Sequence, residues 1–75
     1  MGIIEYKTPH RYRLVDGLCY STEDANLISC TVIERYDMRG KCFISIASEL
    51  SLKDAHRRLG EWMSIPVERL EEFRV

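Results

Sequence analysis

The sequence predicts a small α+β protein with two layers, an antiparallel sheet of three to four strands with one main helix packed on it. Three observations support this class. Residues 28–48 have the pattern of two strands around a tight turn, and residues 51–63 have the spacing and the cap of a helix. With 75 residues, the chain is expected to form a single domain over residues 1–75.

Two short strands are expected near the N-terminus. Residues 3–6 and 12–15 are rich in apolar and aromatic side chains, and Thr8-Pro9 separates them. Asp16-Gly17 is a turn signal that can begin a second hairpin into residues 18–20. Residues 21–26 are expected to form a loop or a single helical turn.

The turn Asp37-Met38-Arg39-Gly40-Lys41 organises the middle of the chain. A three-residue loop with Gly40 in the left-handed region is a common hairpin solution, and it would place Asp37 opposite Lys41. The side-chain period of two then gives one mostly apolar face, which is expected to receive the helix: Cys30, Val32, Glu34, Tyr36, Cys42, Ile44, Ile46 and Ser48. The other face would carry a mixed set: Thr31, Ile33, Arg35, Phe43, Ser45 and Ala47.

The main helix is expected to begin after Ser51, which can cap it, with Asp54 three residues later. Leu50 before the cap can pack against Ala55. The helix should end before Pro66, because proline disfavours helical geometry at the residue before it.

Apolar residues at helical spacing predict which side of this helix faces the sheet: Leu52, Ala55, Leu59 and either Trp62 or Met63. Trp62 is therefore expected to be a core residue. Asp54 with Arg58, and Arg57 with Glu61, can pair on the outer side.

The tail, residues 67–75, fits two patterns. Val67, Leu70 and Arg74 have helical spacing, whereas Glu71, Phe73 and Val75 alternate as in a strand. We interpret it as a final strand.

Three cysteines, an odd number without close pairs, argue against a disulfide framework and predict a reducing compartment, the cytoplasm of the protein's own cell or of a host. All three are expected to be small buried hydrophobic residues. No basic and apolar leader and no apolar run of membrane-spanning length is present in the sequence, so neither classical secretion nor membrane insertion is expected.

The sequence does not predict an enzyme, a cofactor or a small-molecule substrate. Zinc is not expected, because the cysteines and the two histidines offer no closely spaced ligand pair. No local signature of an activated nucleophile or of a glycine-rich phosphate loop is present. Both His10 and His56 are expected at the surface.

Charge is distributed unevenly along the chain. Residues 1–15 carry +2, from three bases and one glutamate, whereas residues 61–75 carry −2, from four glutamates and two arginines. The basic end and the helix supply the candidate partner-binding residues Lys7, Arg11, Tyr12, Arg13, Lys53, Arg57 and Arg58. The alternative for the basic strand is a solvated edge whose charges hinder aggregation. The net charge of −1 does not favour nonspecific binding to nucleic acid.

A nucleic-acid alternative comes from residues 51–70, where a helix, Gly60 and a second short segment are arranged as in a helix-turn-helix. The spacing departs from that motif, since Gly60 lies five residues after Ala55, and Pro66 and Arg69 fall where apolar packing residues are needed.

Residues 43–62 form a strand ending in Ile46-Ala47, then Glu49, Leu52 and Asp54-Ala55, and finally Glu61-Trp62 on one helix. This region resembles small phage proteins that bind and inhibit bacterial RNA polymerase. The resemblance implies a protein without catalytic residues that occupies a polymerase surface through charged contacts.

The sequence therefore predicts a non-enzymatic protein–protein interaction module with a partner-blocking or regulatory role, of which inhibition of a host RNA polymerase is an example. The alternative hypothesis is a small DNA-binding regulator that uses residues 51–70.

Overall fold

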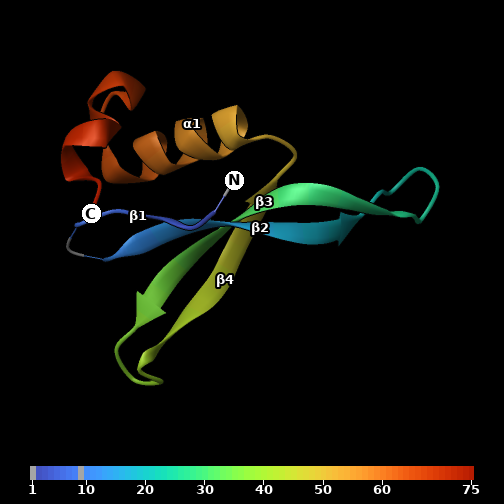
Figure 1. Ribbon diagram of the computed structural model, residues 1–75, viewed down its shortest axis with the longest axis horizontal. Helices are drawn as coiled ribbons and strands as arrows, with labels where there is room; N and C mark the ends of the chain where they lie inside the picture. Colours follow the sequence, from blue (N-terminus) through green and yellow to red (C-terminus); the bar gives the residue numbers. More distant parts are fainter. Residues whose placement is uncertain (1, 9) are drawn as a thin grey trace.

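The structure, a computed structural model, describes residues 2–8 and 10–75. It contains the strands β1 (Ile4–Glu5), β2 (Tyr12–Tyr20), β3 (Leu27–Asp37) and β4 (Cys42–Glu49), the helix α1 (Leu52–Met63) and the 3-10 helix η1 (Val67–Phe73). The strands form one antiparallel sheet in the order β1-β2-β3-β4, with α1 packed on it (Figure 1). The predicted α+β class is confirmed.

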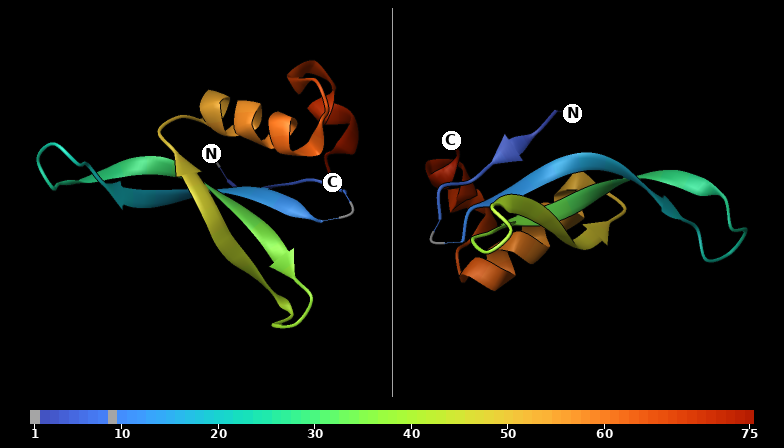
Figure 2. Two further views of the ribbon diagram at one scale, coloured as in Figure 1. Left: turned by 180° about the vertical axis from the view of Figure 1, so that it is seen from behind. Right: turned by 90° about the horizontal axis from the view of Figure 1, so that it is seen from below.

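The long strand β3 determines the shape of the molecule. Its 11 residues pair with β2 on one side and with β4 on the other. The β2–β3 hairpin extends well beyond the helix, and the β3–β4 hairpin diverges from it in another direction (Figures 1 and 2). One helix therefore covers only the middle of one sheet face, and we call the other side the open face.

The core lies between α1, η1 and the covered part of the sheet. Seven buried residues form it: Tyr6, Tyr12, Leu14, Ile33, Ala55, Leu59 and Leu70. Ala55 and Leu59 are four residues apart, so they lie on one side of the helix, as its predicted apolar stripe requires.

The predicted turn at Asp16-Gly17 is wrong, because β2 continues through it to Tyr20. Gly17 pairs with Cys30, and a Cβ at Gly17 would lie 2.6 Å from Val32 Cγ2. The glycine therefore permits a close approach between strands rather than a turn. The actual turn covers residues 21–26, where a loop or a single helical turn is predicted.

The predicted register of the β3–β4 hairpin is also wrong. Asp37 pairs with Cys42, so the loop has one more residue than expected, and Lys41 rather than Gly40 is left-handed, with φ 54°. The Asp37 carboxylate accepts hydrogen bonds from the N–H groups of Arg39 and Gly40 and stabilises this longer turn.

The face predicted to receive the helix is wrong as well. The helix packs on Ile33 and Ala47, which belong to the predicted mixed face, whereas Ile44 and Ile46 of the predicted apolar face remain 39% and 37% exposed. Ile33 pairs with Ala47 but Glu34 pairs with Ser45, so Ile46 is the extra residue of a bulge.

The predicted helix is confirmed, with Ser51 as its N-cap: Ser51 Oγ accepts a hydrogen bond of 3.1 Å from the Asp54 N–H. The packing predicted for Leu50 is wrong, since Leu50 is 69% exposed. Trp62 is 43% exposed rather than a core residue, although its ring centre lies 6.1 Å from that of Tyr12 at the start of β2.

The predicted ion pairs on α1 are replaced by others. Arg57 pairs with Asp54 at 2.9 Å, and Arg58 pairs with Glu49 of β4 at 2.6 Å. Arg58 therefore ties the helix to the sheet instead of lying on the outer side of the helix.

The tail is a 3-10 helix rather than the predicted strand. Leu70 is buried against the core, and Arg69 pairs with Glu72 three residues later, a spacing that lies on one side of a 3-10 helix. After η1, Arg74 makes an isolated bridge with Tyr6. No second α-helix follows α1 in residues 64–75, so a helix-turn-helix does not form there.

The cysteine prediction is confirmed for Cys30, which is buried, and wrong for Cys42, which is exposed; Cys19 is intermediate. Burial raises the pKa of the Cys30 thiol, with a hydrogen bond to Cys19 as the second cause. His10 is exposed as expected, but His56 is partly buried.

Candidate functional site

The sheet divides the predicted partner-binding residues into separate groups. Arg11 and Arg13 lie at the open face, whereas Lys53, Arg57 and Arg58 are carried by α1 on the covered face. These candidate residues therefore do not form one continuous surface.

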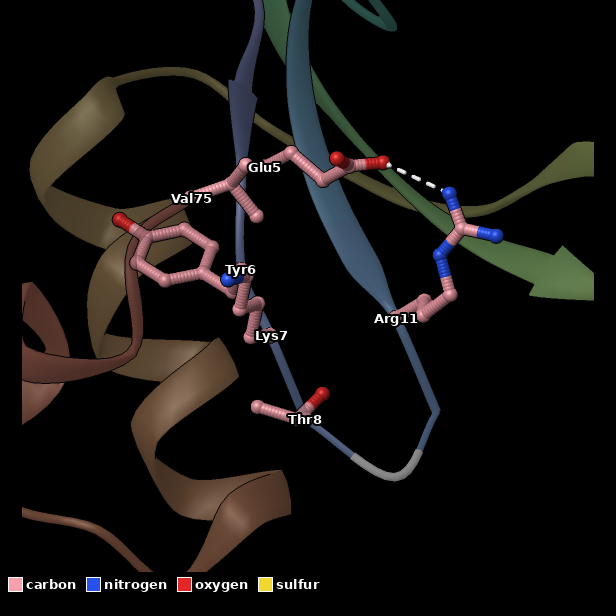
Figure 3. A pocket seen from close by; sticks show the side chains of 6 residues that line it. All are labelled: Glu5, Tyr6, Lys7, Thr8, Arg11 and Val75. Atoms are coloured by element: carbon pink, nitrogen blue, oxygen red, sulfur yellow. Dashed lines mark hydrogen bonds and ion pairs between the residues drawn. The ribbon is translucent and has the colours of Figure 1, made fainter.

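The two remaining predicted residues differ in accessibility. Tyr12 is 7% exposed and belongs to the core, so its ring offers little surface to a partner. Lys7 is exposed beside β1, where it lines a shallow hollow of about 460 Å³ together with Thr8 and Arg11 (Figure 3).

Arg11 and Arg13 pack on two aromatic rings. The Arg13 guanidinium lies 3.9 Å from the centre of the Phe43 ring, and that of Arg11 lies 4.5 Å from the centre of the Tyr36 ring. Tyr36 and Phe43 are cross-strand partners, with ring centres 5.3 Å apart. We call Arg11, Arg13, Tyr36 and Phe43 the arginine–aromatic cluster.

Carboxylates neutralise this cluster. Glu34 pairs with Arg13 at 2.5 Å, and Glu5 pairs with Arg11 at 3.2 Å (Figure 3). Phosphate tracking depends on cations that neutralise the phosphates. Arginine and aromatic side chains are also common at the centres of protein interfaces. Arginines that are already paired with carboxylates fit a protein interface better than a surface that tracks phosphates.

A second surface was not predicted from the sequence. Leu18, Tyr20 and Leu27 are 65%, 70% and 56% exposed. Tyr20 pairs with Leu27, and Leu18 with Ser29, so the three side chains share one face of the β2–β3 hairpin, beyond the helix (Figure 1). Leu50 is 69% exposed and lines a hollow of about 350 Å³ together with Tyr20. We call Leu18, Tyr20, Leu27 and Leu50 the arm patch.

The sequence contains a signal for part of this patch. Leu18 and Tyr20 continue the alternation of Tyr12 and Leu14, which points to one long strand. Reading Asp16-Gly17 as a turn concealed that alternation. Exposure of the patch depends on how far α1 extends over the sheet, which no local pattern specifies.

A partly buried polar contact joins the residue after β1 to α1. The Tyr6 hydroxyl and His56 Nε2 share a hydrogen bond of 2.7 Å. Burial lowers the pKa of His56 and raises that of Tyr6. Tyr6 is 2% exposed, and we therefore assign this pair to holding the elements together.

Metal-ligating side chains do not gather in threes anywhere in residues 2–8 and 10–75. The helices of this described part are too short or too polar to cross a membrane. Comparison of the chain with models of known protein families, with curated proteins and with solved structures gives no match.

Proposed function

We propose that this protein is a non-enzymatic protein-binding module that docks through the arm patch and thereby regulates or blocks its partner. The observation that carries the proposal is the exposure of Leu18, Tyr20 and Leu27, at 65%, 70% and 56%, on one face of a projecting hairpin. Exposed apolar groups of this kind mark interaction sites.

The energetics favour a protein partner for this surface. Full burial of one leucine-sized side chain contributes about 1.5–3 kcal/mol. Four such residues can offset a substantial part of the free-energy cost of association. A two-stranded ribbon is also marginally stable by itself, so a partner that covers the hairpin would order it as well.

The arginine–aromatic cluster is the second contact surface in this proposal, and the helix residues Lys53, Arg57 and Arg58 remain candidates for electrostatic steering. The resemblance of residues 43–62 to phage inhibitors makes bacterial RNA polymerase the first purified partner to test. Inhibition of transcription would then follow from occupation of the polymerase surface.

The test compares the wild-type protein with two double variants. Leu18→Ser with Leu27→Ser removes half of the arm patch, whereas Ile3→Ser with Met38→Ser removes apolar side chains that are equally exposed, at 65% and 78%, but lie elsewhere. Each tagged protein is added to nuclease-treated bacterial lysate and, separately, to purified bacterial RNA polymerase. Retained proteins are identified by mass spectrometry, and polymerase affinity and transcription are measured directly.

We expect a defined protein partner to remain after nuclease treatment, with retention reduced about tenfold or more by the arm-patch variant and unchanged by the control. Equal retention by both variants would refute docking through the arm. Retention of nucleic acid alone, from lysate without nuclease, would favour the DNA-binding alternative. That alternative also requires duplex affinity to fall with salt and to weaken in an Arg57→Ala, Arg58→Ala variant.

A further inference from the structure

A pocket of about 210 Å³ lies where the β1–β2 connection meets the end of α1 and the end of η1. Its lining is mainly aromatic and apolar: Thr8, His10, Tyr12, Trp62, Met63, Ile65 and Phe73. We call it the aromatic pocket. It is separated from the arm patch, because Tyr12 begins β2 and Tyr20 ends it.

The rings that line the aromatic pocket are set at different angles. The ring centres of Tyr12 and Trp62 are 6.1 Å apart with planes inclined by 37°, and those of His10 and Tyr12 are 6.2 Å apart with planes inclined by 65°. Phe73 lines the same space from η1. All four rings line the same pocket, so a cation bound there would lie near several aromatic side chains.

The lining residues determine which kind of ammonium group the aromatic pocket can bind. None of the described residues that line the pocket is Asp or Glu, so a primary ammonium would lose its hydrating water without gaining carboxylate partners there. A methylated ammonium has apolar groups around its charge and needs few or no hydrogen-bond acceptors. It is therefore the cation that an aromatic pocket without lining carboxylates accepts most readily.

The surrounding charge is compatible with a cation. Residues 61–75, which supply four of the lining residues, carry four glutamates and two arginines. Arg58 lies 5.8 Å from the centre of the Trp62 ring, but its charge is paired with Glu49 at 2.6 Å.

We propose that the aromatic pocket binds a methylated ammonium group through cation–π contacts with Trp62 and Phe73. A dry cavity of about 150 Å³ can hold benzene, so the volume of about 210 Å³ accommodates a trimethylammonium group and the start of its chain. This group occurs in small free molecules and in trimethylated lysine side chains of proteins, and the experiment separates these two sources.

Trp62 is the only tryptophan of the chain, so its fluorescence reports directly on the pocket. The free-ligand arm titrates the protein with choline and with 3,3-dimethyl-1-butanol, which has the same shape without the charge. The protein arm titrates it with a peptide that carries trimethyl-lysine and with the same peptide unmodified. Nuclear magnetic resonance shifts of Trp62 and Phe73 confirm the location.

We expect a saturable response to choline or to the methylated peptide, and about threefold or more weaker binding of the matched uncharged or unmodified compound. Phe73→Leu should weaken binding about threefold or more, whereas Phe43→Leu, on the open face, should leave it unchanged. Folding of both variants is checked by circular dichroism. Equal binding of choline and its neutral analogue, or no saturable response to any of these compounds, would overturn the proposal.

Discussion

At the scale of single residues, polar contacts within this small core carry specific consequences. Tyr6 and His56 share a hydrogen bond in largely apolar surroundings. The charge of Glu71 raises the pKa of both groups, and the charge of Arg74 lowers the pKa of both. Burial is the largest influence on each group, so the folded state favours the neutral imidazole.

Protonation of His56 should therefore destabilise the fold. The pKa of His56 is lowered in the folded protein, whereas the pKa of a histidine in the unfolded chain is about 6.5. As the pH falls from about 7.5 through 6.5, the unfolded state takes up a proton that the folded state resists. We expect the free energy of unfolding in urea to decrease over this range, and the decrease to be smaller in His56→Gln.

His10→Gln is the matched control for this prediction, because His10 is exposed and contacts neither Tyr6 nor His56 in any described hydrogen bond. It should retain the pH dependence of the wild type. An unchanged slope in His56→Gln would show that other groups cause it.

The contact between Arg13 and Phe43 should be measurable as a coupling energy. Their separation of 3.9 Å at a partly exposed site predicts a coupling of about 0.5–1 kcal/mol in a double-mutant cycle of Arg13→Ala and Phe43→Leu. Arg39 lies in the exposed turn before Phe43, so a cycle of Arg39→Ala with Phe43→Leu should give no coupling. Equal values in the two cycles would contradict the contact.

At the scale of elements, packing overrides local propensity at the end of α1. Gly60 is buried in the helix, and the Ile65 N–H donates a hydrogen bond to its carbonyl oxygen at 3.0 Å. A Cβ at Gly60 would lie 2.8 Å from the Ile65 carbonyl oxygen, which belongs to the backbone and cannot simply rotate away.

Gly60→Ala should therefore destabilise the protein, although alanine favours a helix interior by about 1 kcal/mol over glycine. We expect a net loss of about 1–2 kcal/mol in urea unfolding, within the range for overpacked sites. Lys53→Ala, at an exposed position of the same helix, should change stability little. A more stable Gly60→Ala variant would refute the close approach.

The elements also show what a sequence can specify locally. The cap at Ser51 is predictable because its hydrogen bond to Asp54 spans three residues. The β3–β4 register is not, because Asp37 stabilises a longer loop and a bulge at Ile46 interrupts the pairing. Each of these shifts the pairing by one residue, so the partners across the two strands differ from the predicted ones.

At the scale of the whole molecule, both ends of the chain complete one core. Tyr6 directly follows β1 and Leu70 lies in η1, and both are 2% exposed beside Leu14 and Leu59. The tail, which the strand hypothesis would have placed at a sheet edge, instead covers one end of the helix.

Leu70→Ala should consequently destabilise the entire fold rather than only the tail. We expect a loss of about 2–5 kcal/mol, observed equally by Trp62 fluorescence and by helical circular dichroism in urea. Val67→Ala, in the same 3-10 helix but at a residue that is 45% exposed, is the control and should cost much less. Similar losses in the two variants would contradict the assigned role of Leu70.

The sequence by itself determined the α+β class, the capped helix and the loop over residues 21–26, because each depends on contacts between neighbours in the chain. It also supplied Arg11 and Arg13 as candidates, but not their stacking on Tyr36 and Phe43. Only the tertiary structure decided which sheet face is covered, how far β2 extends and where Trp62 lies. The reason is geometric: a helix of 12 residues cannot cover strands of 9 and 11 residues that diverge beneath it. The apolar side chains beyond its reach, and the aromatic pocket at its end, are products of that arrangement.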